Sequence, residues 1–148
     1  MGNYTNYSKI IAGTMTWGSW GKQLSTTQMA ALIEQCLEIG ITTFDHADIY
    51  GDYGNEAEFG KAFQKSKISR SDVQLISKCG IQMLSDARKT SVKHYQYDKE
   101  YIIQSVEQSL KNLKTDYLDF LLLHRPSPLI QPEEVAEAIL SLKNAGKI

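Results

Sequence analysis

One stretch decides the fold of this chain, Thr42-Thr43-Phe44-Asp45-His46-Ala47-Asp48-Ile49-Tyr50-Gly51. Its first residues are β-branched or aromatic, as in a buried strand, and the run ends in the acid Asp45. Tyr50 follows five residues later, just before Gly51. The pattern predicts a strand that runs out into a loop carrying ionisable side chains.

The same arrangement recurs twice downstream. The strand-like run 73–77 ends in Lys78, and the run 117–123 ends in His124. Three predicted strands therefore each deliver one ionisable residue at the same end.

Amphipathic helices are predicted between the strands, because apolar residues recur at helical spacing in four places. Ser25 and Gln28 have the spacing of a capping box that opens the first helix, and Gly40 is placed to close it. Asp98 is placed to cap the third helix, and Pro132 begins the fourth. With a short strand at 9–12, the chain makes four β-α units in series.

The segment 79–97 is expected to be irregular, and a connection of that length is usually functional or mobile. Within it, one group of residues is expected to form a solvated face, with a substrate lid as the alternative: Arg88, Lys89, Lys93 and His94. Cys79 is interpreted as a small buried spacer, with a thiol of lowered pKa as the alternative.

Four β-α units favour parallel strands with right-handed crossovers, so that Asp45, Lys78 and His124 converge at one end of the sheet. An α/β fold of this kind is either a (β/α)8 TIM-type barrel or an open doubly wound sheet. No G-x-G-x-x-G motif follows the first strand, which disfavours the open sheet. In a barrel, catalytic groups come from the C-terminal ends of several strands, as predicted here.

Composition limits the partners. The 148 residues, 42% hydrophobic and 22% charged, fit one domain with a real core. The net charge of −1, without a basic cluster, makes nucleic acid and anionic membranes poor partners and favours a small molecule. The longest apolar run, 120–123, is far short of the roughly 20 residues of a membrane helix. Two cysteines and a polar segment at 1–9, unlike a signal peptide, indicate a cytoplasmic protein.

These motifs resemble the aldo-keto reductase superfamily, and most closely its bacterial oxidoreductases with an Asp-His-Ala-Asp-Ile-Tyr-Gly segment like residues 45–51. The resemblance implies a (β/α)8 barrel that uses NADPH to reduce aldehydes and ketones. The catalytic tetrad of the family, Asp, Tyr, Lys and His, matches Asp45, Tyr50, Lys78 and His124.

The loop after the first strand looks like the family's loop facing nicotinamide and substrate. By that resemblance Gly13, Thr14, Met15 and Asp45 are expected to bind the cofactor. Trp17 and Trp20 are expected to face the substrate.

The resemblance covers the whole chain but half of the family's fold. Residues 1–148 are therefore expected to be the N-terminal half of a barrel, its first four β-α units, with the C-terminal half absent. An open four-stranded parallel sheet exposes two edges, so self-association through these edges is a further expectation.

The chemistry can also be argued from the residues. Carbonyl reduction builds negative charge on oxygen and requires a proton donor, for which Tyr50 is the candidate. An adjacent Lys78 ammonium would favour the phenolate, and Asp45 would orient that ammonium through a charged hydrogen bond. His124 would align the carbonyl. A cofactor must supply the hydride, because no side chain can donate one.

Two other functions stay open. A metal-dependent hydrolase could use Asp45, His46, Asp48 and His124 as ligands, but the usual histidine pair leaving the first strand is absent, so no metal is expected. A non-catalytic, cofactor-binding regulatory subunit is the other alternative. His46 and Asp48 are expected to be structural, respectively packing beside the strand end and capping the loop.

Overall fold

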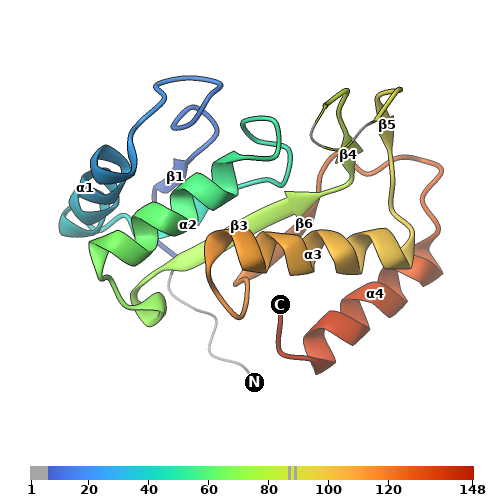
Figure 1. Ribbon diagram of the computed structural model, residues 1–148. Helices are drawn as coiled ribbons and strands as arrows, with labels where there is room; N and C mark the ends of the chain where they lie inside the picture. The colour runs from blue at the N-terminus through green and yellow to red at the C-terminus, as the bar shows by residue number, and fades with distance from the viewer. Residues whose placement is uncertain (1–6, 87, 89) are drawn as a thin grey trace.

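The structure is a computed structural model that describes residues 7–86, 88 and 90–148. The predictions made for the first six residues and for Lys89 lie outside this part of the chain. Figure 1 shows one open sheet with four helices along it. The sheet is parallel, its order is β1-β2-β3-β6, and its strands are β1 (Ile11–Gly13), β2 (Thr43–Asp45), β3 (Gln74–Cys79) and β6 (Phe120–Leu123).

A helix follows each strand of the sheet, and consecutive helices pack against each other. A single turn of 3-10 helix, Arg70–Asp72, precedes β3. The helices are α1 (Thr26–Glu38), α2 (Asn55–Ser66), α3 (Lys99–Leu113) and α4 (Pro132–Asn144). The four β-α units predicted from the sequence are therefore present in the expected order.

The helix ends follow the predicted chemistry. Ser25 and Gln28 form the capping box of α1, with Gln28 N donating to Ser25 Oγ at 3.3 Å. Gly40, at φ +80°, turns the chain out of α1. The Asp98 side chain caps α3 by accepting from Tyr101 N at 2.9 Å. Local sequence thus sets the limits of these helices.

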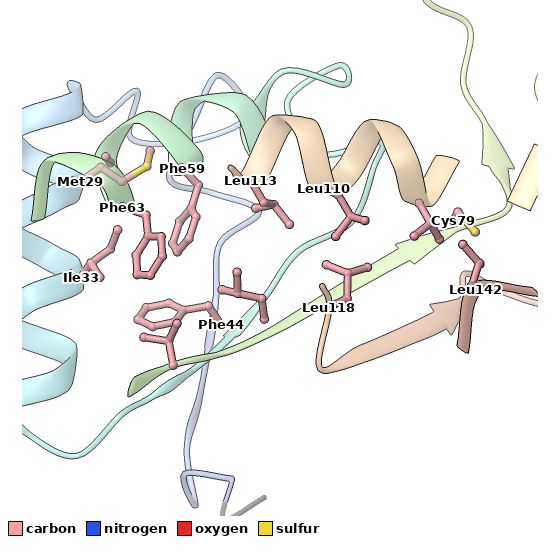
Figure 2. Packing of buried hydrophobic residues seen from close by; sticks show 14 of the residues in the cluster. Met29, Ile33, Phe44, Phe59, Phe63, Cys79, Leu110, Leu113, Leu118 and Leu142 are labelled. Atoms are coloured by element: carbon pink, nitrogen blue, oxygen red, sulfur yellow. The ribbon is translucent and has the colours of Figure 1, made fainter. Parts of the chain in front are cut away.

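The core lies between the sheet and the helices. Figure 2 shows Phe59 and Phe63 of α2 and Leu113 of α3 on the same side of the sheet as Phe44 of β2. Phe44, Phe59 and Leu113 are fully buried. Burial of each such side chain contributes about 1.5–3 kcal/mol, so this layer is the main stabilising feature of the fold.

Several predicted boundaries were wrong. The strand expected at 9–12 is Ile11–Gly13, and the run 117–123 forms a strand only over Phe120–Leu123. β3 continues through Cys79, so Lys78 lies within the strand and not after it. The segment 79–97 is only partly irregular, because it contains an antiparallel hairpin of two short strands, β4 (Ile81–Gln82) and β5 (His94–Tyr95). Gly80, at φ +128°, turns the chain from β3 into this hairpin, a conformation that side-chain patterns do not reveal.

β6 is less buried than its apolar sequence predicts. Phe120 and Leu122 are 41% and 42% exposed on this edge strand, and the Tyr7 ring lies 4.7 Å from the Phe120 ring. Residues 147 and 148 lie outside the strands of the sheet, and Leu118 N donates to Lys147 O at 2.9 Å.

Candidate active site

The four predicted catalytic residues meet at one end of the sheet. Asp45 ends β2, Lys78 lies near the end of β3, His124 directly follows β6, and Tyr50 lies in the turn after β2. Lys78 Nζ lies 2.8 Å from both carboxylate oxygens of Asp45 and donates to Tyr50 Oη at 3.2 Å. The ring centroids of Tyr50 and His124 are 6.3 Å apart, at 85° to each other.

The Lys78 ammonium is held by three groups. Besides Asp45 and Tyr50, Nζ donates to the backbone oxygen of His46 at 2.7 Å. An ammonium has three hydrogens, so each can be directed at one of these groups. Because Lys78 donates to Tyr50 Oη, the phenolic hydrogen of Tyr50 is directed elsewhere.

The surroundings of His124 favour the neutral form of its imidazole. Burial, and then the positive charges of Lys78 and Arg125, lower its pKa, while Asp45 opposes this shift. The backbone holds the residue: His124 N donates to Cys79 O at 2.7 Å, and Tyr97 Oη donates to His124 O at 2.7 Å. Its Nδ1 is buried without a hydrogen-bond partner among the described residues.

The predicted cofactor residues in the loop after β1 differ in exposure. Gly13 and Met15 are exposed, and a Cβ built on Gly13 would meet no atom within 4 Å. Thr14 is fully buried, and its N–H and hydroxyl both donate to Asp45 O at 3.0 Å. Its carbonyl accepts from Asn55 Nδ2 at 3.0 Å. Thr14 thus holds the loop, and only its neighbours present free surface.

The two tryptophans face different ways. The Trp20 ring, 41% exposed, lies 6.3 Å from the Tyr50 ring, beside the tetrad. The Trp17 ring packs 6.2 Å from the rings of Phe44 and Phe59 in the core layer. The Trp17 indole is partly buried against this layer, where burial of apolar area favours it, and its substrate-facing role stays a prediction.

Asp48 and Arg88 have roles that the sequence did not reveal. Asp48 is 3% exposed and has a backbone hydrogen bond from Ile49 in its own loop. It also accepts from Tyr101 Oη at 3.2 Å and Ser105 Oγ at 3.0 Å, both on α3. Arg88 forms an ion pair with Asp48 at 3.8 Å and lies 4.0 Å over the Tyr53 ring. Arg88 is therefore not part of the predicted solvated face, whereas Lys93 and His94 are exposed as expected.

Cys79 is 2% exposed, and burial, followed by the charge of Asp48, raises its pKa to about 12. The interpretation as a buried spacer is confirmed, and the alternative of a lowered-pKa thiol was wrong.

The ligands of the hydrolase alternative do not gather around one point. Asp45 binds Lys78, His46 Nδ1 contacts Thr14, and Asp48 binds α3. Within the described residues, no three His, Cys, Asp or Glu side chains are grouped so as to hold a metal ion. None of the helices in the described ranges has the length and apolar character needed to span a bilayer.

Fold and site together define an α/β protein of four parallel β-α units, with Asp, Tyr, Lys and His at or just beyond the strand ends. The sequence model of the Aldo/keto reductase family matches residues 9–148. The chain belongs to this family.

Two curated relatives are oxidoreductases by their descriptions. The chain is 48% identical over 143 residues to "Uncharacterized oxidoreductase YcsN" of Bacillus subtilis, covering 96% of this chain and 47% of that protein. It is 44% identical to "Oxidoreductase YdhF" of Escherichia coli, with the same coverage of 96% and 47%. The chain thus spans about half the length of these relatives.

Among solved structures, the chain superimposes with a TM-score of 0.78 on "aldo-keto reductase AKR11C1 from Bacillus halodurans (holo form)". Sequence identity is 30%, over 95% of this chain and 43% of that one. This neighbour is a (β/α)8 barrel, so the predicted fold class is confirmed as a partial TIM-type barrel.

Proposed function

We propose that the protein carrying this chain is an NADPH-dependent oxidoreductase that reduces small aldehydes or ketones to alcohols, with Tyr50 as proton donor. One observation carries the proposal: Lys78 Nζ binds both oxygens of Asp45 and also donates to Tyr50 Oη. This contact gives the phenol a positive neighbour and leaves its hydrogen free for an acceptor in the site.

The described residues fit a nicotinamide cofactor. A flat ring needs backbone that it can approach closely, and Gly13 offers open space where a side chain would stand. Gly13, Met15 and Asp45 would hold the ring, while Thr14 would act by fixing the loop. When bound, NADPH supplies the hydride. The preference for NADPH over NADH follows from the family resemblance.

Each side chain of the tetrad would have a separate role at the substrate oxygen. Tyr50 gives its proton to that oxygen as negative charge develops there. Lys78 stabilises the phenolate left behind, and Asp45 keeps the ammonium charged and oriented. His124, neutral at this position, can direct an N–H at the same oxygen and align the carbonyl. Trp20, beside Tyr50, would form a wall of the substrate site.

We further propose that residues 1–148 are the N-terminal half of the barrel. The exposed inner side chains of β6 and the free edges of β1 and β6 need a cover. A C-terminal half would provide it, and in its absence these edges would favour self-association. The cytoplasmic location remains a prediction.

The experiment is an NADPH titration of this chain, followed by nucleotide fluorescence with solution mass recorded in parallel. The protein that carries the chain is then assayed for carbonyl-dependent NADPH oxidation. Turnover supports the proposal. Cofactor binding without turnover across a broad set of aldehydes and ketones would favour the regulatory-subunit alternative. If neither this chain nor the protein that carries it binds NADPH, a nicotinamide-dependent function is rejected.

A further inference from the structure

His46 lies directly behind the tetrad, on the helix side of the sheet. It follows Asp45 in the chain, is fully buried, and packs edge-on against the Phe59 ring at 4.3 Å between centroids. The only polar contact of its ring among the described residues is Nδ1, 2.9 Å from Thr14 Oγ1. His46 is therefore attached to the loop after β1.

The backbone of His46 contacts the tetrad. Its carbonyl accepts from Lys78 Nζ at 2.7 Å, while its N–H donates to Ile76 O at 2.9 Å. One residue thus contacts the cofactor-side loop through its ring and the Lys78 ammonium through its carbonyl. Thr14 strengthens the link, because its N–H and hydroxyl both hold the carbonyl of Asp45, the preceding residue.

The hydrogen bonds assign the protonation of the ring. Burial, and then the charge of Lys78, lower the pKa of His46 to about 3, so the ring is neutral and carries one N–H. If the Thr14 hydroxyl donates to Asp45 O, Oγ1 must accept from His46 Nδ1–H. Nε2 is then a bare nitrogen in an apolar surrounding. The other tautomer would bury an N–H donor without a partner, which is the rarer arrangement in proteins.

We propose that His46 is a positioning residue, held as the Nδ1–H tautomer by Thr14, that couples the loop after β1 to the ammonium of Lys78. Displacement of this loop moves Thr14, and with it the backbone of Asp45 and His46. The Asp45 carboxylate and the His46 carbonyl accept two of the three ammonium hydrogens. The inference rests on the proposed function only in treating Lys78 as catalytic. The coupling itself is a property of this chain.

The tautomer is tested first, in the unmodified chain, by NMR of ¹⁵N-labelled histidine. We expect the His46 Nδ1 to show the shift of a protonated nitrogen and Nε2 that of a bare one, unchanged between pH 5 and pH 8. A protonated Nε2 with a bare Nδ1 would overturn the assignment.

Matched variants test the coupling. Thr14→Ser keeps the hydroxyl and Thr14→Val removes it, while His46→Asn keeps a donor near the Nδ1 position and His46→Leu removes it. The readout is hydrogen exchange at Lys78 Nζ, followed by ¹⁵N NMR of the lysine ammonium groups. We expect about tenfold faster exchange in Thr14→Val and His46→Leu, as for one lost hydrogen bond, and little change in the two conservative variants.

The two proposals fail in different ways. Equal exchange rates at Lys78 in all four folded variants would overturn the coupling, whatever the activity. Faster exchange at Lys78 Nζ in Thr14→Val and His46→Leu, in a protein that reduces no carbonyl compound, would support the coupling and reject the proposed reductase function. Amide spectra check folding, and the histidine pair decides the coupling alone if Thr14→Val fails to fold.

Discussion

Lys78 Nζ lies 3.2 Å from the phenolic oxygen of Tyr50, with its remaining hydrogens directed at Asp45 and the carbonyl of His46. Lys78 is only 14% exposed, so the ammonium is partly withdrawn from water and kept in place by these groups. An ammonium arranged in this way stabilises the negative charge that develops on the phenolic oxygen when its proton is transferred.

Tyr50→Phe should remove the proton donor and leave the pocket shape unchanged. We expect kcat to fall by about 10²–10⁴, the usual contribution of general acid catalysis, with NADPH affinity within about twofold. Steady-state kinetics and a nucleotide titration measure both quantities. Tyr53→Phe is the matched control, because Tyr53 Oη accepts from Met83 N at 2.9 Å in the hairpin and has no contact with Lys78 among the described residues. Comparable kcat values for the Tyr50 variant and the wild type would reject Tyr50 as the acid.

Lys78→Ala should remove the positive charge beside Tyr50 and leave a small space where the side chain stood. We expect kcat to fall by about 10²–10⁴ and to recover in part when ethylammonium is added, because a small amine can restore the charge. Rescue is measured as kcat against amine concentration, with tetramethylammonium, which has no N–H, as the control ion. Equal stimulation by both ions would show that a hydrogen bond to Tyr50 is not required.

Glu56→Gln should stabilise the folded chain at pH values above the ordinary pKa range of a carboxyl group. Glu56 is 2% exposed, accepts from Ser77 Oγ at 2.6 Å, and forms no salt bridge within the described residues. Burial is the main cause that raises its pKa. A carboxyl with a raised pKa in the folded state contributes stability below its unfolded pKa of about 4.3 and loses it as pH rises through the folded pKa.

The measurement is the thermal midpoint of the wild type and the Glu56→Gln variant from pH 4.5 to pH 8. We expect the variant to gain on the order of 1 kcal/mol, or about 3 °C, at pH 8 and nothing at the acidic end. Glu58→Gln, at an exposed position of the same helix, is the control. A variant that is less stable than the wild type at pH 8 would contradict the prediction.

Gly60→Ala should separate α2 from α3. A Cβ on Gly60 would lie 2.1 Å from the carbonyl oxygen of Asn112 and 2.9 Å from the carbonyl carbon of Leu113, both backbone atoms. Backbone cannot move aside as a side chain can, so we expect a loss of about 1–3 kcal/mol in the free energy of unfolding. Urea denaturation measures it, with Lys61→Ala at the exposed neighbouring position as the control. Unchanged stability of the Gly60 variant would show that the helices pack less closely than described.

Much of the site could be predicted from the sequence because it depends on chain order. Asp45 and Lys78 lie near the ends of strands, and His124 directly follows one. Parallel strands joined by helices end on the same side of the sheet, so the sequence order of strands and helices predicts that these three residues meet. The caps at Ser25 and Asp98 are local hydrogen bonds between residues three positions apart, which sequence also shows.

Only the tertiary structure decided which way individual side chains turn and what they meet. Trp17 packs in the core and Trp20 lies beside Tyr50, although both come from one short loop. The contacts of Asp48 with Ser105 and of His46 with Thr14 join residues 57 and 32 positions apart. The sequence by itself determined the class of fold and the chemistry at the strand ends, because strand and helix periods are local. The buried partners behind the site depend on packing between distant segments, and no local pattern records that packing.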